Sequence, residues 1–174
     1  MKTISIPTFG GPEQLKLLEM PQPEPAAGEV LIKLEYSGLN FIDVYMRNGH
    51  YARSQTYKTP LPMTLGMEGA GTVAQAGVDV ADFKTGDRVA YCIVRGSYAE
   101  YAVVPAARLV HVPQQVPMDA ATALMLQGIT AHSLSHSAFP PANGTPFLGH
   151  AAAGGGGEAR AGVWSRKTRG DRPG

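Results

Sequence analysis

The amino-acid sequence predicts a mainly β fold with a few helices, and two observations carry this prediction. Glycines interrupt short apolar runs at regular intervals between residues 66 and 89. Upstream, residues 30–36 alternate, with Ile32, Leu34 and Tyr36 on one face and charged side chains on the other. Because glycine reaches positive φ without steric cost, this spacing is typical of tightly curved strands in a small barrel rather than of an open sheet.

Further strands are expected on both sides of these two stretches. Short runs bounded by glycine or proline predict strands over residues 2–6, 15–18, 98–104 and 108–112. Pro113 and Pro117 follow the last of these runs, so the first domain should end near residue 118.

Two segments change to helical spacing. Residues 40–48 place apolar side chains on one face, and Gly49 follows as a C-terminal capping residue. Asp119 is suited to cap a second helix that runs to about residue 137. The polar, proline-bounded stretch 51–62 between strands is interpreted as a loop bordering a cleft.

Composition excludes several classes of function. A net charge of +1 provides no basic field for nucleic acid. The single cysteine, Cys92, excludes a disulfide framework and a thiolate zinc centre within one chain, and fits a reducing cytosol. No apolar run approaches the roughly 18 residues that span a bilayer. We therefore expect a cytoplasmic protein with neither nucleic acid nor membrane as a partner.

The glycine-rich stretch also carries a resemblance. Its spacing G-x-E-x-x-G-x-V-x-x-x-G-x-x-V-x-x-x-x-x-G-D-x-V, from Gly66 to Val89, resembles the medium-chain dehydrogenase/reductase superfamily. Residues 37–45, 96–101 and 126–132 resemble its zinc-free, zeta-crystallin-like quinone oxidoreductases. The resemblance implies a GroES-like β-barrel catalytic domain, followed by the start of an incomplete Rossmann domain.

The resemblance also divides the chain. It implies a GroES-like catalytic domain over residues 1–118, and a linking helix with a remnant of the nucleotide-binding domain over 119–155. Residues 156–174 have no apolar period, and we expect them to be a disordered tail outside the family pattern. We attribute the abrupt change to a truncated or out-of-frame reading of the nucleotide-binding domain.

The resemblance implies an NADPH:quinone oxidoreductase that transfers a hydride without zinc. Asn40 and Tyr45 are the candidate catalytic residues, because an amide and a phenol at the cleft mouth can bind quinone oxygens or the nicotinamide. Asn40 as a plain helix cap and Tyr45 as a core residue remain alternatives. Glu68, in the matched motif, is interpreted as a structural hydrogen-bonding residue.

NADPH is the cofactor that the resemblance implies. Its candidate contacts are Gly128 and Thr130 on the linking helix, and Gly154, Gly155 and Gly157 in a phosphate-facing turn. A hydroxyl that bonds back to the preceding helical turn is the alternative for Thr130. Because no acidic or basic residue that could bind the ribose follows at the usual distance, we expect the cofactor site of this chain to be incomplete.

No metal is expected. Ser37 and Met67 stand where zinc-dependent members of the superfamily carry a cysteine and a histidine. A hydroxyl and a thioether do not replace a thiolate and an imidazole. His132 and His136 form one pair four residues apart, but no third ligand is near them in sequence, so they are interpreted as ordinary solvated histidines.

Two other functions stay open. An enoyl or alkenal reductase is the enzymatic alternative, since hydride addition to a conjugated carbonyl makes similar demands. A non-catalytic barrel that acts as a binding module is the other. The partner is expected to be a quinone or conjugated carbonyl, and the resemblance implies a homodimer for a complete family member.

Overall fold

The computed structural model describes residues 1–57, 59–138, 140 and 142. The chain divides into two compact units, the first covering Met1–Thr122 and the second beginning at Ala123. The expected Rossmann remnant and tail from residue 143 onward lie outside the described residues, and the predicted domain boundary at residue 118 stays a prediction.

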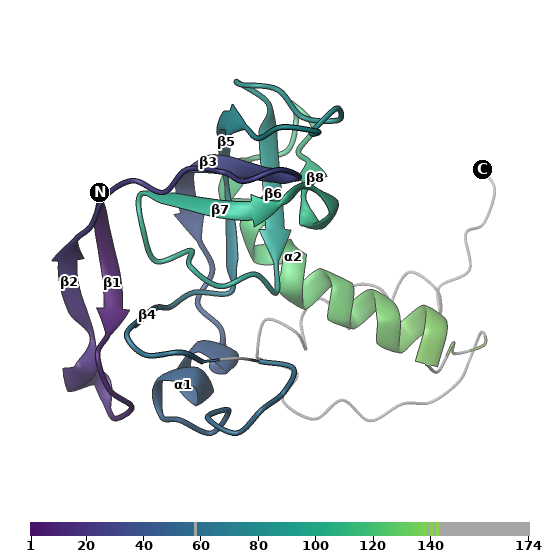
Figure 1. The fold of residues 1–174 in the computed structure, drawn as a ribbon. Coiled ribbons are helices and arrows are strands. Elements are labelled where there is room, and N and C mark those ends of the chain that lie inside the picture. The colour runs from purple at the N-terminus through teal and green to yellow at the C-terminus, as the bar shows by residue number, and fades with distance from the viewer. Residues whose placement is uncertain (58, 139, 141, 143–174) are drawn as a thin grey trace, which may run out of the picture. The chain divides into compact units, whose positions relative to one another are not determined.

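A five-stranded antiparallel sheet forms the centre of the first unit (Figure 1). Its strands lie in the order β7-β3-β5-β6-β8. Their bounds are Glu29–Ser37 for β3, Glu68–Ala76 for β5, Arg88–Cys92 for β6, Tyr101–Pro105 for β7 and Val110–His111 for β8. The mainly β architecture expected from the sequence is therefore confirmed.

The glycines of β5 permit a close approach to β3. A Cβ atom at Gly71 would lie 2.1 Å from the backbone oxygen of Lys33. The register of the β3–β5 pair also shifts twice, between Leu31 and Ile32 and between Leu34 and Tyr36. Such shifts increase local twist, which is how this sheet acquires its curvature.

A smaller antiparallel sheet has the order β2-β1-β4. It consists of β1 (Lys2–Ile6), β2 (Lys16–Glu19) and β4 (Met63–Thr64), with a short 3₁₀ turn, η1, over Pro12–Gln14. Figure 1 shows β1 and β2 side by side as a hairpin at the N-terminus. A bridge from Thr3 to Ala99 links this hairpin to the segment that leads into β7.

Helices complete the described chain. The first, α1, covers Phe41–Arg47 with Asn40 as its N-cap, and Gly49 follows it with φ +80°. The 3₁₀ turn η2 covers Ala106–Arg108, α2 covers Met118–His132, and a π-helical turn, η3, continues over Ser133–Ala138. Among the described residues, no helix is long and apolar enough to cross a membrane.

Three predicted boundaries are wrong. The strand expected from residue 98 begins at Tyr101, because the preceding residues pair with β1 instead of β3. The strand expected over 108–112 shortens to Val110–His111, since η2 precedes it. Asp119 lies inside the first turn of α2 rather than capping it, because the helix already begins at Met118.

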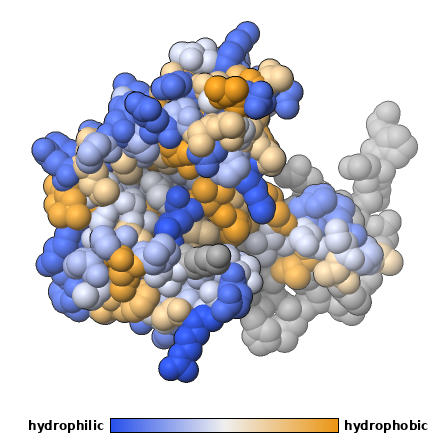
Figure 2. All heavy atoms as spheres, in the orientation of Figure 1, coloured by the Kyte–Doolittle hydropathy of each residue, from blue (hydrophilic) through white to orange (hydrophobic). Residues whose placement is uncertain are grey.

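The first unit has two hydrophobic clusters. The barrel cluster fills the space enclosed by the five-stranded sheet and contains Val30, Ile32, Val73, Phe83, Val89, Tyr91, Ala102, Val104 and Leu109. The methionine cluster lies between the small sheet and α1 and contains Ile6, Met46, Met63, Leu65 and Met67, with Phe9, Ile42, Tyr51, Tyr57 and Tyr98 packed against it. The visible outer surface carries mostly hydrophilic side chains broken by separate apolar patches (Figure 2).

Candidate active site

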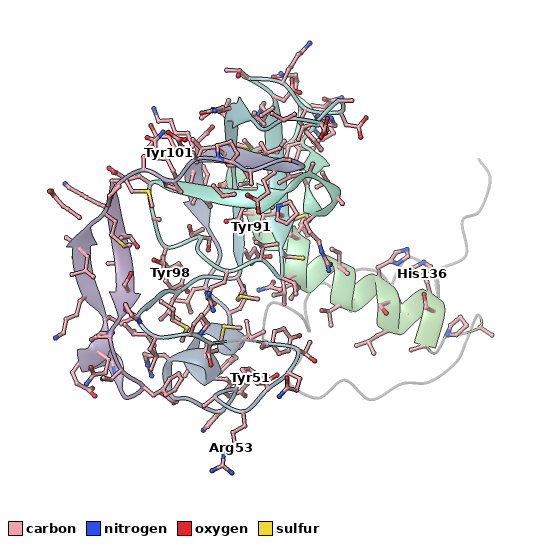
Figure 3. All side chains as sticks on the ribbon, in the orientation of Figure 1. Tyr51, Arg53, Tyr91, Tyr98, Tyr101 and His136 are labelled. Carbon is pink, nitrogen blue, oxygen red and sulfur yellow. The ribbon has the colours of Figure 1, made fainter. Side chains whose placement is uncertain are left out.

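Buried hydrogen bonds fix the N-terminus of α1. The backbone N–H of Asn40 donates to Oδ2 of Asp43 at 2.9 Å, which satisfies one of the unpaired amides at the helix start. The hydroxyl of Tyr98 donates to the same oxygen at 3.0 Å. Tyr98, labelled in Figure 3, comes from the segment before β7, so Asp43 ties the first turn of α1 to that segment.

Glu68 extends this network from the first residue of β5. Its side chain is 1% exposed, and its Oε2 accepts a hydrogen bond from the amide Nδ2 of Asn40 at 2.8 Å. A Cβ atom at residue 38 would lie 2.0 Å from this oxygen, so Gly38 leaves the space that the carboxylate occupies. Glu68 therefore makes a buried hydrogen bond of the kind that its structural interpretation requires, and that interpretation stays a prediction.

Burial governs the protonation of the network. It raises the pKa of Asp43, against the opposing effect of the Asn40 backbone, the Tyr98 hydroxyl and the backbone of Met67 and Gly66. Burial also raises the pKa of Tyr98, and the adjacent Asp43 carboxylate adds to this rise. The Tyr98 hydroxyl therefore keeps its proton and acts as a donor.

An aromatic row lies on α1 and the loop that follows it. Tyr45 stands at its centre, with ring centroids 6.2 Å from Phe41, 5.6 Å from His50 and 6.2 Å from Tyr51. Tyr51 in turn lies 5.0 Å from Tyr57. Phe41 is 75% exposed and Tyr45 is 40% exposed, so one end of the row is open to a ligand. Such a surface can stack against a flat, unsaturated ring.

The two candidate catalytic residues lie in different environments. Asn40 is only 9% exposed, and its amide is bound to Glu68. It is also the N-cap of α1, as the alternative interpretation held. Tyr45 lies one and a half turns further on, and its exposed ring belongs to the aromatic row. A catalytic role for either residue stays a prediction.

The candidate cofactor residues that can be described lie on α2, in the second unit. Thr130 is exposed and its Oγ1 donates to the carbonyl oxygen of Leu126 at 2.8 Å. A Cβ atom at Gly128 would make ordinary contact with Leu124 at 3.7 Å, so helix packing does not itself require glycine there. The predicted phosphate-facing residues Gly154, Gly155 and Gly157 lie outside the described residues.

Sequence reasoning missed Asp43, Tyr98 and Tyr51. Asp43 stands three residues after Asn40, and this spacing is a recognisable capping-box signal. Tyr98 contacts Asp43 from 55 residues further along the chain, whereas Tyr51 lies in the loop that directly follows α1. No periodicity in the sequence indicates either contact.

The positions where the superfamily binds zinc hold other side chains. Met67 is buried in the methionine cluster. Cys92 is half-buried, and both burial and the charge of Glu68 raise the pKa of its thiol. Within the part of the chain that the structure describes, no three His, Cys, Asp or Glu side chains gather as a metal-binding group. The expectation that this chain needs no zinc stays a prediction.

Comparison with known proteins finds oxidoreductases among the proteins that this chain resembles. The family model of the alcohol dehydrogenase GroES-like domain matches residues 26–114. A probable quinone oxidoreductase of Schizosaccharomyces pombe is 41% identical over 153 residues, which are 87% of this chain and 45% of that protein. The chain spans about half the length of the curated relatives it matches.

Solved structures of reductases also match the fold of this chain. The Escherichia coli quinone oxidoreductase complexed with NADPH matches with a TM-score of 0.91 and 32% identity, over 97% of this chain and 50% of that one. The CurK enoyl reductase matches with a TM-score of 0.85 and 28% identity, over 96% of this chain and 52% of that one.

Proposed function

Since this chain belongs to the alcohol dehydrogenase GroES-like domain family, we propose that it provides the quinone-binding part of an NADPH-dependent, zinc-independent quinone reductase. The observation that carries this proposal is the aromatic row, which is open at Phe41 and Tyr45 and rests on a buried hydrogen-bond network. The resemblance to quinone oxidoreductases predicted from the sequence is confirmed by the relatives.

The aromatic row suits a quinone on two counts. A quinone ring is flat and electron-poor, so it stacks favourably on phenylalanine and tyrosine rings. Its carbonyl oxygens accept hydrogen bonds, and the phenol of Tyr45 can donate one as negative charge develops on the oxygen during reduction. In this proposal Tyr45 therefore both stacks against the quinone ring and donates a hydrogen bond to a quinone oxygen.

Asn40 has a positioning role in this proposal. One N–H of its amide is committed to Glu68, so the amide plane is fixed and the start of α1 is held against β5. Fixing the helix start also fixes the direction in which Tyr45 projects. A positioned hydrogen-bond donor costs no reorganisation at the moment of reaction, which is how such a scaffold lowers a barrier.

The described residues that would contact NADPH fit the cofactor in their chemistry. Thr130 commits its hydroxyl proton to Leu126, so its oxygen remains able to accept a hydrogen bond from the nicotinamide carboxamide. Bound NADPH would supply a hydride, so that quinone, NADPH and one proton give hydroquinone and NADP⁺. Gly128, two residues earlier on α2, has no side chain to hinder an approach to the backbone.

Binding of duroquinone, measured by calorimetry, tests the substrate site. Every ring carbon of this quinone is substituted, so it cannot add to the thiol of Cys92. We expect Tyr45→Ala to weaken binding about tenfold, the equivalent of about 1.4 kcal/mol. Tyr101→Ala should leave binding unchanged, because Tyr101 lies at the opposite end of the first unit from Tyr51 (Figure 3). Equal binding by both variants would contradict the assignment.

Quinone-dependent loss of NADPH absorbance tests the reaction itself. Turnover by this chain would show that its cofactor contacts are sufficient. Saturable duroquinone binding without turnover would instead support the non-catalytic alternative for this chain. Homodimer formation and a cytoplasmic location stay predictions in either case.

An enoyl reductase is the second candidate, because the CurK enoyl reductase has a closely similar fold. Replacing the quinone by a conjugated enone in the same absorbance assay distinguishes the two. Faster NADPH oxidation with the enone would favour the second candidate over the first.

A further inference from the structure

We propose that His132 and His136 bind one divalent transition-metal ion, of the class that prefers imidazole nitrogen, such as Ni²⁺, Cu²⁺ or Zn²⁺. His132 is the last residue of α2, and His136 lies in the π-helical turn η3. The site is contained within the second unit, and it involves none of the residues where the superfamily binds zinc. It is independent of the proposed function.

The two imidazole rings already lie together. Their centroids are 4.2 Å apart and their planes differ by 7°. Both side chains are exposed, so an ion from solvent can reach them. Two histidines four residues apart on one helical face are an established pair of zinc ligands in proteins. Because the two ring planes are nearly parallel, the His132 ring would have to rotate about its Cβ–Cγ bond to direct a nitrogen at an ion bound by His136.

The hydrogen bonds of His136 determine which nitrogen is available. Its Nδ1 lies 2.9 Å from Oγ of Ser135 and 3.2 Å from the carbonyl oxygen of His132. Ser135 directs its hydroxyl proton to the carbonyl oxygen of Ala131, at 2.7 Å, so its oxygen faces His136 as an acceptor. The His132 carbonyl is an acceptor as well, and therefore Nδ1 of His136 must carry the proton.

This protonation pattern is the one that a metal ligand needs. With the proton on Nδ1, the neutral ring presents the lone pair of Nε2 to solvent. Metal-binding histidines usually donate their second N–H to a carbonyl or another acceptor, and this bond fixes the tautomer and the ring orientation. His136 has this arrangement, which the sequence pattern could not reveal.

The local charge also permits a cation. Residues 120–138 contain no Lys, Arg, Asp or Glu, so no neighbouring cation in this stretch opposes the ion. With only two protein ligands, water would fill the remaining positions. We therefore expect exchangeable binding rather than the closed four-ligand coordination of a structural zinc site.

Calorimetric titration of the full 174-residue chain with NiCl₂ tests the proposal. We expect one ion per chain. His132→Gln and His136→Gln should each weaken binding at least about tenfold, because a single imidazole remains. The double substitution His136→Ser with Ser137→His keeps the number of histidines but changes their spacing, and it should weaken binding equally. His111→Gln, on β8, should leave affinity unchanged. Circular dichroism confirms that each variant is folded.

Two results would overturn the proposal. The first is undiminished Ni²⁺ affinity in the spacing variant, which would place the binding on other groups. The second comes from heteronuclear NMR of the imidazole rings in the metal-free chain, which reports the tautomer directly. We expect the Nδ1–H form for His136, and a dominant Nε2–H form would remove the basis of the site.

Discussion

The barrel cluster and the methionine cluster belong to the same compact unit but are built from different side chains. Five of the nine buried residues in the barrel cluster are valine or isoleucine, which have stiff, β-branched side chains. Three of the five buried residues in the methionine cluster are methionine, whose unbranched side chain adapts to irregular space. The first cluster joins sheet strands, whereas the second lies beneath the aromatic row.

This difference separates the part of the molecule that fixes the fold from the part that adapts to a ligand. The barrel cluster is enclosed by five strands, so its shape is determined by strand pairing. The methionine cluster supports Tyr51 and Tyr57, and these rings continue the row that is open at Tyr45. A deformable support lets aromatic rings shift when a flat ligand stacks on them. Substitutions in the barrel cluster should therefore lower the stability without changing ligand binding. Conservative substitutions in the methionine cluster should instead change ligand binding with little effect on the stability.

The largest expected effect is on the barrel cluster. Ile32 is fully buried on β3, where it pairs with Val73 of β5 and Ala102 of β7. Ile32→Ala removes three carbon atoms from a site that the surrounding strands cannot close. We expect a loss of about 2–5 kcal/mol in the free energy of unfolding, measured by urea denaturation. Duroquinone affinity of the folded protein should not change.

Val78→Ala is the matched control, because Val78 is an aliphatic residue that is 73% exposed. Its truncation should change the free energy of unfolding by less than about 0.5 kcal/mol. If Ile32→Ala weakened quinone binding at a temperature where the variant is fully folded, the proposed separation of fold and site would be wrong.

An intermediate effect is expected at Asp43, which joins α1 to the segment that precedes β7. Its pKa is raised above the ordinary value of 3.8, chiefly by burial. The folded protein therefore binds this proton more tightly than the unfolded chain does. The resulting contribution to stability is complete below about pH 4 and is lost as the pH rises through the raised pKa.

Asp43→Asn removes this titration. The amide nitrogen also replaces a buried oxygen near the backbone of Gly66 and Met67, so we expect the variant to be about 1–3 kcal/mol less stable at low pH. The deficit should shrink as the pH rises from about 4, because only the wild type loses stability through this group. Chemical denaturation across that range measures it, and a deficit that grew with pH would contradict the direction of the shift.

How much of this could be predicted from the sequence differs between the two regions. The alternation of Ile32, Leu34 and Tyr36 correctly predicted the strand β3. Its burial departs from a period of two, because residues 30–32 are buried in succession and Tyr36 is exposed beyond a register shift. The glycine spacing from Gly66 to Val89 likewise predicted the strands β5 and β6, and positive φ is found at Gly66 and Gly86. The close approach of β3 at Gly71 was not predicted. Local periodicity and glycine chemistry therefore account for most of the barrel.

The candidate site depends on contacts that periodicity does not encode. Asn40 is hydrogen-bonded to Glu68, which lies 28 residues away in the sequence, and Tyr98 is hydrogen-bonded to Asp43, which lies 55 residues away. These contacts depend on where the chain passes from one sheet to the other. Ala99 pairs with Thr3 of the small sheet, and Tyr101 pairs with Lys33 of the five-stranded sheet. Sequence spacing suggested Asn40 and Tyr45 through resemblance, but it gave no sign that one would be buried and the other exposed.

The smallest expected effect on stability is in the methionine cluster. Met46 is 2% exposed on α1 and packs with Met63 and Met67. Met46→Leu nearly conserves volume, so it should cost less than about 1.5 kcal/mol. Leucine has fewer rotatable bonds, however, and the support beneath Tyr51 becomes less adaptable.

We therefore expect the variant to bind phenanthrenequinone less tightly while its affinity for the smaller duroquinone stays near that of the wild type. Calorimetry with both quinones measures the ratio of the two affinities. An unchanged ratio would show that the methionine cluster is as rigid as the barrel cluster, because ring size would then have no bearing on how the row accommodates its ligand.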